Sequence, residues 1–445
     1  MGRPSQSRAL GVWMNGMRVG TWRLQARGAE EFQYDPSWLT SERFRPLSLS
    51  LPAPAGGGPL RGAIIGNYFD NLLPDNAEMR RRLQARFGTK SLAPFDLLAA
   101  VGRDCVGALQ LLPEDEAPKN IEVIDGTPLD ETGVEQELIR TVSMPGALGQ
   151  HDDDDGLRIS IAGAQEKTAL LLHQGSWCRP NGATPSTHIF KLPLGTVGNR
   201  QLDLATSVEN EWLCLKLLEA FGLPVAQAQI ATFGTQKCLV VERFDRALHP
   251  SGKFWLRLAQ EDMCQATGTP GAKKYEEHGG PGILALASLL RQSEDSGDVE
   301  RFLKTQVLFW MLRLIDGHAK NFSIALRTGG RFRLTPTYDV LSAWPFIGDG
   351  ATLIPAQKVK MAMAWSGKNR HYHAEQIMPR HFVETARRCG FADGLVGMLE
   401  SLVAATPSAV ERVRAQLPAN FPVRVAESVF DGAVASANRL GNLSG

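Results

Sequence analysis

The stretch Asp316-Gly317-His318-Ala319-Lys320-Asn321 decides the fold of this chain. It places an aspartate and an asparagine with four residues between them, and a second aspartate, Asp339, follows 18 positions after Asn321. Before this stretch, apolar residues at 299, 302, 303, 307, 310, 311 and 314 predict a helix with one buried face. After it, apolar residues alternate with polar or small ones on both sides of a Thr-Gly-Gly turn at 328–330, which predicts a hairpin.

Protein kinases have the same order of elements around their catalytic loop: a helix, an aspartate, an asparagine, a hairpin and a second aspartate. There the first aspartate accepts the proton of the substrate hydroxyl, while the asparagine and the second aspartate hold the metal ions that bridge the phosphates of ATP. Asp316, Asn321 and Asp339 occur in this order, which predicts a phosphotransferase. The motif alone leaves a lipid or small-molecule kinase open.

The segment before this loop has the element order of a kinase small lobe. Two predicted strands at 157–161 and 168–172 flank a loop whose Gly-x-x-x-Lys-Thr run lacks the first glycine of a Walker A motif. A P-loop NTPase is therefore disfavoured, and a hairpin that covers a phosphate tail remains open. Lys191 lies in a short apolar strand, where an ammonium group is costly unless it meets an anion. The other elements expected are a helix from 206 to 222 and strands at 228–233 and 238–241.

The N-terminal part alternates short apolar runs with turn residues. Asn15-Gly16 between two such runs predicts a β-hairpin, since both residues tolerate positive φ. Helical segments are expected at 69–87 and 94–101. The acidic stretch 112–155 is rich in Pro and Gly and reads as a surface connection near a domain boundary. Its last four residues are aspartates, and we expect them to be solvated and not to form a metal site.

These patterns predict an α+β protein with a two-lobed, protein-kinase-like fold. Three parts are expected: a β-rich N-terminal subdomain at 1–150, a small lobe with the nucleotide loop at 151–250, and a mainly helical large lobe with the catalytic loop at 251–445.

Composition excludes several classes of protein. The 445 residues are 43% hydrophobic and 21% charged, which is typical of a globular protein and not of a disordered one. A formal net charge of +1 argues against nucleic-acid binding through overall charge, so any DNA contact must be local or shared with a partner. The six cysteines are scattered without a CxxC pair, and neither a signal core nor a membrane-length apolar run occurs, which predicts a cytoplasmic protein with reduced thiols.

Seven short stretches together resemble the HipA family of serine/threonine-kinase toxins, which pair with HipB antitoxins. The likeness covers almost the whole chain. The stretches are Ser160-Ile-Ala-Gly-Ala-Gln-Glu-Lys-Thr, Thr187-His-Ile-Phe-Lys-Leu-Pro, Glu242-Arg-Phe-Asp-Arg, Gln260-Glu-Asp-Met and Asp316-Gly-His-Ala-Lys-Asn-Phe, with Pro46-Leu-Ser-Leu-Ser-Leu-Pro and Phe69-Asp-Asn-Leu-Leu-Pro near the N-terminus.

The resemblance implies roles for particular residues. Asp316 becomes the catalytic base, Asn321 and Asp339 bind Mg²⁺, and Ser160 matches the serine that the family autophosphorylates to inactivate itself. The implied partners are a HipB-type antitoxin dimer, operator DNA bound through that antitoxin, and glutamyl-tRNA synthetase as substrate, with no membrane partner. The implied ATP-binding residues are Ala162, Gly163, Ala164, Gln165, Glu166, Lys167, Lys191, Glu242, Arg243, Phe244, His318, Ala319, Lys320, Asn321, Tyr338 and Asp339.

Several features depart from eukaryotic-like kinases. Leu-Ile stands before Asp316 in place of His-Arg, Tyr-Asp-Val surrounds Asp339 in place of Asp-Phe-Gly, and the nucleotide loop has one glycine in place of three. A rival hypothesis is an idle kinase fold that serves as a corepressor in an antitoxin–DNA complex. The basic residues at 358–388, Arg387 and Arg388 among them, read either as a solvated face or as a patch that contacts DNA phosphates.

Overall fold

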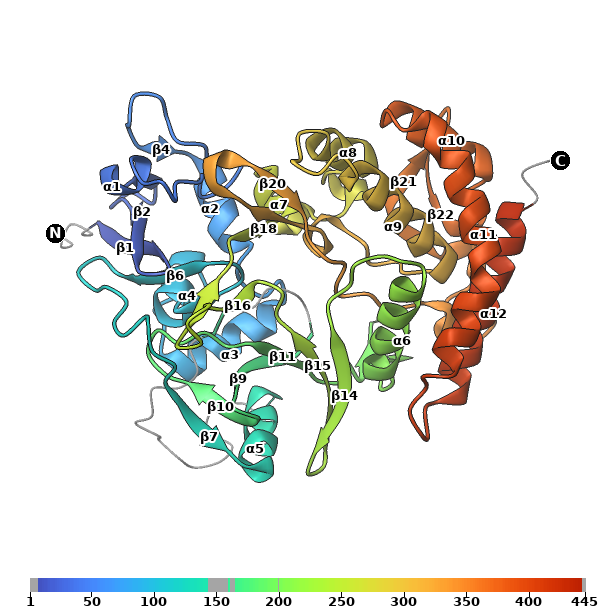
Figure 1. Ribbon diagram of the computed structural model, residues 1–445, viewed down its shortest axis with the longest axis horizontal. Coiled ribbons are helices and arrows are strands. Elements are labelled where there is room, and N and C mark those ends of the chain that lie inside the picture. Colours follow the sequence, from blue (N-terminus) through green and yellow to red (C-terminus); the bar gives the residue numbers. More distant parts are fainter. Residues whose placement is uncertain (1–6, 143–158, 161–164, 199, 442–445) are drawn as a thin grey trace. The chain divides into compact units, whose positions relative to one another are not determined.

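The computed structural model describes residues 7–142, 159–160, 165–198 and 200–441 (Figure 1). The predicted acidic run at 152–155 lies outside the described residues. The chain divides into two compact units. Unit 1 consists of residues 1–192, 231–272 and 324–332, and unit 2 of residues 193–230, 273–323 and 333–445.

Unit 1 begins with an antiparallel five-stranded sheet in the order β4-β3-β2-β1-β6. The β1–β2 hairpin turns at Asn15 and Gly16, whose φ values of 45° and 79° are positive, which confirms the predicted hairpin. The strands are β1 (Arg8–Met14), β2 (Met17–Leu24), β3 (Glu30–Tyr34), β4 (Leu60–Arg61) and β6 (Leu109–Pro113).

Helices pack on this sheet. Trp22 of β2 stacks on Phe69 of α2 (Ala63–Asp70), with ring centroids 4.0 Å apart. The helical segment predicted at 69–87 is helical in the last two residues of α2 and in α3 (Ala77–Phe87) but not between them. The Asn76 side chain begins α3 by accepting a hydrogen bond from the Glu78 N–H. The segment predicted at 94–101 is α4 (Pro94–Val101), as expected.

The second sheet of unit 1 has six strands in the order β14-β15-β11-β9-β10-β7. Its core contains Leu170, Phe190 and Val240, and α5 (Glu131–Val142) adds Val134 and Leu138 to that core. The strands are β7 (Gly126–Leu129), β9 (Lys167–His173), β10 (Ser176–Pro180), β11 (His188–Lys191), β14 (Ala228–Phe233) and β15 (Gln236–Glu242).

Two expectations for this region are wrong. The supposed surface connection at 112–155 contains β7 and α5, which extend the sheet and fill its core. The strand before the nucleotide loop, β8 (Ile159–Ser160), does not form a hairpin with β9, because it pairs in parallel with β5 (Asp104–Cys105). Alternation in a sequence predicts a strand, but it does not name the strand's partner.

Unit 2 is mainly helical. Figure 1 shows α11 and α12 lying side by side, with α9 packed on α12 and α6 on α11. The helix predicted at 299–315 is α9, which ends earlier because Arg313 adopts a left-handed φ of 51°. The helices are α6 (Ser207–Ala220), α8 (Ile283–Leu290), α9 (Asp298–Leu312), α10 (Pro379–Arg388), α11 (Ala392–Arg414) and α12 (Val423–Gly441).

Short elements complete the fold. The predicted hairpin after the catalytic loop is β19 (Ser323–Leu326) and β20 (Phe332–Leu334), joined by β18 (Gln260–Asp262) in a three-stranded sheet. The remaining strands and helices are β12 (Thr196–Val197), β13 (Leu202–Asp203), β16 (Arg246–Leu248), β17 (Trp255–Arg257), β21 (Lys360–Ser366), β22 (Arg370–His373), α1 (Pro36–Leu39) and α7 (Met263–Ala266). No helix within the described residues is long and apolar enough to cross a bilayer.

A buried glutamate, Glu261, lies under the Pro-Leu-Ser-Leu-Ser-Leu-Pro stretch of unit 1. Its Oε1 accepts the Leu49 N–H at 2.9 Å, while its Oε2 has no hydrogen-bond partner among the described residues. Burial raises the pKa of Glu261 to about 8. The folded protein therefore holds Glu261 protonated at neutral pH, whereas the unfolded chain ionises it.

Stability should consequently fall as pH rises. The unfolded chain loses the Glu261 proton near its ordinary pKa of 4.5, and the folded protein loses it only near 8. Between these pH values the free energy of unfolding therefore falls by at most ~1.4 kcal/mol per pH unit. Glu261→Gln should remove this component. Thermal denaturation of both proteins between pH 5 and pH 8 measures it, and equal pH dependence in both would contradict the assignment.

Candidate active site

Helix α9 leads into the predicted catalytic loop and ends at Arg313. The left-handed φ of this residue is uncommon for a residue other than glycine, and its side chain is buried. The guanidinium lies over the Trp344 ring at 4.7 Å and donates to Glu375 Oε1 at 3.0 Å. The Arg313 carbonyl accepts the Ala343 N–H at 2.9 Å. These contacts fix the turn from which Asp316 emerges.

The catalytic loop exposes one carboxylate and buries its neighbours. The side chain of Asp316 is 58% exposed, whereas His318 and Asn321 are buried. Asn321 Nδ2 and the His318 N–H each donate to the Asp316 carbonyl at 2.8 Å. A Cβ at Gly317 would lie 2.4 Å from a ring carbon of Phe309 in α9, so the loop can pack this closely only with glycine. The backbone of Asp316 is thus held while its carboxylate faces outward.

Asn321 suits the metal-binding role predicted for it. Its amide nitrogen is used within the loop, and its amide oxygen accepts no hydrogen bond from the described residues. Carboxylate and amide oxygens are the ligands that Mg²⁺ prefers in proteins. The oxygens of Asn321 and Asp339 therefore fit the metal ion that the kinase hypothesis requires.

Asp339 has a strained backbone that its neighbours maintain. Its φ is 57°, which favours glycine and is costly for an aspartate. On one side, the Thr337 N–H donates to the Pro224 carbonyl at 2.9 Å. On the other, Ser342 exchanges two hydrogen bonds of 2.8 and 2.9 Å with the buried side chain of Asn210 in α6. Anchors two and three residues away thus hold Asp339 in a conformation that its own side chain does not favour.

The predicted nucleotide neighbours of unit 2 lie around the same loop. The Tyr338 hydroxyl donates to the Lys320 carbonyl at 3.0 Å and lies 2.5 Å from Ser323 Oγ. Ala319 and Lys320 are buried in a single 3₁₀ turn. Tyr338 therefore ties the segment of Asp339 to the catalytic loop.

A residue that no sequence motif indicates, Tyr275, touches the predicted base. The hydroxyl of Tyr275 donates a hydrogen bond to Asp316 Oδ1. Tyr275 stands in a polar stretch, Lys273-Lys274-Tyr275-Glu276-Glu277, that has neither helical nor strand periodicity. No pattern in that stretch points to the catalytic loop, and only the fold brings the two together.

Unit 1 assembles the other predicted nucleotide contacts around Lys191. This residue ends β11, is buried, and pairs in register with Lys167 of β9. Gln165 Nε2 donates to the Leu192 carbonyl at 2.6 Å, and the Leu192 N–H donates to the Glu166 carbonyl at 3.1 Å. The second half of the predicted nucleotide loop therefore lies beside the lysine strand. Ala162, Gly163 and Ala164 fall outside the described residues, as does the side chain of Ser160, whose backbone pairs with Cys105.

Three of the predicted ATP-binding residues, Glu242, Arg243 and Phe244, are those that the family resemblance implies as the hinge that reads adenine, and Arg243 belongs to a buried ionic network. Arg243 uses both its backbone groups within unit 1, donating to the Thr187 carbonyl and accepting the Arg246 N–H. Asp104 Oδ2 accepts the Ser186 hydroxyl at 2.6 Å. The backbone N–H and carbonyl of Arg243 are therefore both used within the fold. The five charged members of the network, all in unit 1, are Asp104, Asp245, Arg243, Arg246 and Arg257.

Electrostatics in this network favour the charged forms of both acids. Burial opposes the ionisation of Asp104, but Arg246, Arg243 and Arg257 outweigh it and hold the pKa of Asp104 well below its usual value. Asp104 belongs to β5, the strand with which β8 pairs. The network therefore joins the hinge to the strand that precedes the nucleotide loop.

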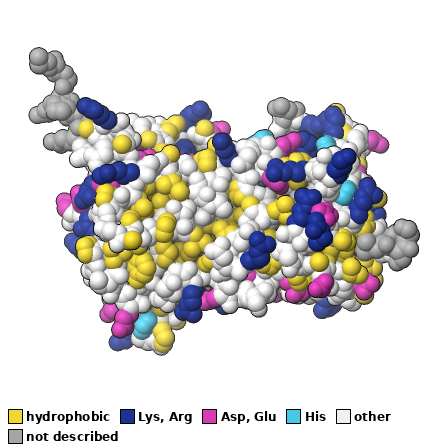
Figure 2. All heavy atoms as spheres, turned by 90° about the horizontal axis from the view of Figure 1, so that it is seen from above, with side chains coloured by type: hydrophobic (Ala, Val, Ile, Leu, Met, Phe, Trp, Pro, Cys, Tyr) yellow, Lys and Arg dark blue, Asp and Glu magenta, His cyan; other side chains and the backbone are white. Residues whose placement is uncertain are grey.

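The two arginines predicted to contact DNA lie at the end of α10. Arg387 donates to both oxygens of Glu384 at 2.9 Å, and Arg388 donates to Glu384 Oε1 at 2.6 Å and to the Gly367 carbonyl at 3.1 Å. Figure 2 shows basic side chains interspersed with acidic ones over the part of this face that carries α8 and α10. A DNA phosphate would have to compete with Glu384 for both arginines.

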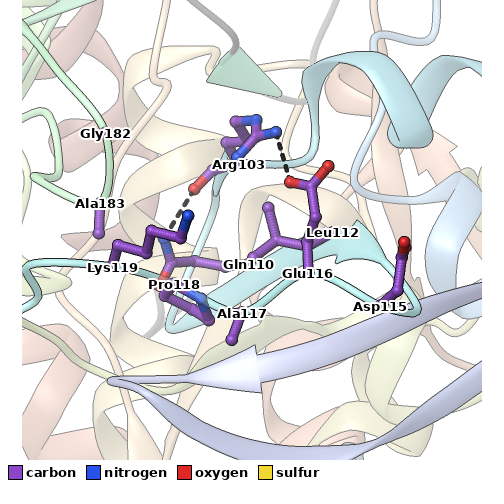
Figure 3. A pocket seen from close by; sticks show the side chains of 10 residues that line it. All are labelled: Arg103, Gln110, Leu112, Asp115, Glu116, Ala117, Pro118, Lys119, Gly182 and Ala183. Carbon is purple, nitrogen blue, oxygen red and sulfur yellow. Dashed lines mark hydrogen bonds and ion pairs between the residues drawn. The ribbon is translucent and has the colours of Figure 1, made fainter.

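A pocket of about 470 Å³ lies elsewhere in unit 1 (Figure 3). Its wall includes the ion pair between Arg103 and Glu116, at 3.0 Å, and Gln110, whose Nε2 donates to the Arg103 carbonyl. None of the predicted ATP-binding residues that the structure describes lines it.

Comparisons with known proteins show which family the chain matches. Two family descriptions match the chain, the HipA N-terminal domain at residues 10–112 and the HipA-like C-terminal domain at residues 159–416. Protein Y4mE of Sinorhizobium fredii, which carries a provisional kinase name, is 34% identical over 362 residues, 80% of this chain and 82% of that one. The serine/threonine-protein kinase toxin HipA of Shewanella oneidensis is 29% identical over 313 residues, 67% of this chain and 66% of that one.

The fold has a solved counterpart as well. A chain of the Shewanella oneidensis complex of HipA, HipB and operator DNA superimposes with a TM-score of 0.77, covers 97% of both chains and is 23% identical. This likeness, with the β-rich N-terminal region and the helical C-terminal part, confirms the predicted α+β kinase-like fold.

Proposed function

Because this chain belongs to the HipA family of serine/threonine kinases, we propose that it is an ATP-dependent protein serine/threonine kinase and the toxin of a type II toxin–antitoxin system. The observation that carries the proposal is the catalytic loop, which presents the Asp316 carboxylate to solvent and leaves the amide oxygen of Asn321 without a donor among the described residues.

Asp316 acts as the general base in the proposed reaction. The oxygen of a substrate serine or threonine attacks the γ-phosphorus of ATP, the bond from that phosphorus to ADP breaks, and the hydroxyl proton passes to the Asp316 carboxylate. Mg²⁺ would neutralise charge on the phosphates, and Asn321 and Asp339 would hold it. Lys191 would bind the phosphates, while backbone groups of the hinge at 242–244 would read adenine.

The proposed partners follow from the family. They are a HipB-type antitoxin dimer and, through it, operator DNA, as in the Shewanella oneidensis complex. In that complex Arg387 and Arg388 would give up their hydrogen bonds to Glu384 and contact DNA phosphates instead. The proposed substrate is glutamyl-tRNA synthetase, whose phosphorylation would halt translation. All six cysteines are buried free thiols, which suits action in the reducing cytoplasm.

The direct test is incubation with γ-labelled ATP and Mg²⁺. Label should enter purified glutamyl-tRNA synthetase, the chain itself, or both, and a cell lysate shows which other proteins accept it. Label on lipid or small molecules alone would favour the other kinase classes. No label on any acceptor, together with intact repression through an antitoxin, would favour the idle corepressor.

Lys191→Ala and Asp339→Asn should each weaken the binding of Mg-ATP by about tenfold or more, because they remove a charge partner of the phosphates and of the metal ion. Calorimetric titration measures the affinity. Lys237→Ala, on the neighbouring strand β15, is a control that should leave it unchanged. Wild-type affinity in both test variants would remove Lys191 and Asp339 from the nucleotide site.

Phosphorylation of Ser160 should inactivate the enzyme. A phosphate adds close to two negative charges just before the loop at 162–167, and repulsion from the ATP phosphates should keep that loop from closing. Mass spectrometry should find the phosphate in the wild-type protein and not in Asp316→Asn, with Ser160→Ala as the control for the site. Phosphorylated protein that binds ATP and transfers phosphate at the unmodified rate would contradict the switch.

A further inference from the structure

We infer that Tyr275 is a positioning residue for the catalytic base, a role that rests on the proposed kinase function. Its hydroxyl donates to Oδ1 of Asp316. The other carboxylate oxygen, Oδ2, lies 3.8 Å from His318 Nε2, beyond hydrogen-bond distance. One oxygen is thus held by the tyrosine, and the other is left for the hydroxyl of the substrate.

The carboxylate needs such a restraint because it is exposed. A side chain with 58% of its surface in solvent can rotate among staggered conformers, and each of them places the carboxylate oxygens differently. The hydrogen bonds from Asn321 and His318 hold the carbonyl of Asp316 and leave its side chain free to turn. Tyr275 supplies the missing constraint on the carboxylate itself.

The phenol ring is itself held from several sides. It meets the buried His318 ring edge to face, with centroids 5.0 Å apart and planes at 87°, and the His278 ring at 5.8 Å. Lys274 Nζ lies 5.5 Å from the centre of the tyrosine ring. Because His318 belongs to the catalytic loop, the tyrosine ring packs directly against the loop that carries Asp316.

The backbone around Tyr275 is anchored at both ends. The Lys274 carbonyl accepts the Ala319 N–H of the catalytic loop at 3.3 Å, and the Tyr275 carbonyl accepts the N–H groups of His278 and Gly280 at 3.0 Å. Glu276 Oε2 accepts the Ala364 N–H of β21 at 2.7 Å. Because its backbone is already fixed, Tyr275 loses little conformational entropy when its hydroxyl holds the carboxylate.

The test is Tyr275→Phe, which keeps the ring and removes only the hydroxyl. The rate of label transfer from γ-labelled ATP at saturation, to the chain itself or to glutamyl-tRNA synthetase, should fall about tenfold, because a misplaced base loses reactive geometry. KM for ATP and the melting temperature should stay at wild-type values. Tyr372→Phe, the same change at a half-buried tyrosine of β22, is the matched control and should keep the full rate.

A double-mutant cycle separates positioning from other roles. In the Asp316→Asn background, Tyr275→Phe should leave the residual rate unchanged, since the group it acts through is gone. An unchanged or raised rate in Tyr275→Phe alone, or an equal fall in both backgrounds, would overturn the inference. A wild-type protein without any transfer activity would instead overturn the proposed function.

Discussion

Asp316→Asn should slow phosphoryl transfer by about a thousandfold while leaving ATP binding close to wild type. An amide is a poor base, and general-base catalysis contributes about 10²- to 10⁴-fold to the rate of an enzyme. The Asp316 side chain points to solvent, and its backbone carbonyl keeps the hydrogen bonds from Asn321 and His318, so the fold should persist. Single-turnover transfer from γ-labelled ATP measures the rate, and expression of the variant should no longer arrest growth.

Asp349→Asn serves as the control for this variant. It makes the same change at an acidic residue of unit 2 outside the predicted site, and it should keep full activity and toxicity. Should Asp316→Asn stay both active and toxic, the assignment of the base would be wrong. Loss of ATP affinity together with a lower melting temperature would mean instead that Asp316 serves the fold.

Asp104→Asn should lower the free energy of unfolding by about 3–5 kcal/mol, because removing one partner of a buried ion network leaves guanidinium groups uncompensated. Asp104 accepts from Arg246 at 2.9 Å, Arg257 at 3.1 Å and Arg243 at 3.3 Å, and all four side chains are buried. After the substitution, Asp245 would be the one remaining acid in this network. Denaturant unfolding of the full chain, followed at several wavelengths, measures the loss.

Asp115→Asn provides the comparison. Asp115 is an exposed carboxylate of the same unit, and its substitution should change stability by no more than about 0.5 kcal/mol. A similar small change for Asp104→Asn would show that the arginines reach solvent or other acids when Asp104 is neutralised. Because Asp104 and β8 share a sheet, the same variant should also make residues 159–160 exchange their amide hydrogens faster.

Local chemistry made part of the site predictable from the sequence. The spacing of Asp316 and Asn321 is short, so one turn of chain is enough to bring the Asn321 amide to the Asp316 carbonyl. Lys191 stands out in the sequence because an ammonium group inside an apolar strand is costly, and the structure buries it. The hairpin at Asn15-Gly16 follows from two residues that adopt positive φ readily.

Other parts of the site depend on residues far apart in the sequence. Tyr275 and Asp316 are 41 positions apart, and Asn210 and Ser342 are 132 apart, so no periodicity or motif links them. The prediction that β8 pairs with β9 is wrong for the same reason. Both β9 and the distant strand Asp104–Cys105 could pair with β8, and only packing selects between them.

Spacing within a few residues is enough to specify the helix, the aspartate–asparagine loop and the buried lysine strand. The φ of 57° at Asp339, the hydrogen bond from Tyr275 to Asp316 and the buried arginines around Asp104 depend instead on residues brought together by the fold. Each of these is unfavourable or undefined in an isolated segment: an aspartate avoids left-handed backbone, an exposed carboxylate rotates, and a buried guanidinium needs an acid from another strand. Only contacts made across the fold can hold them in place.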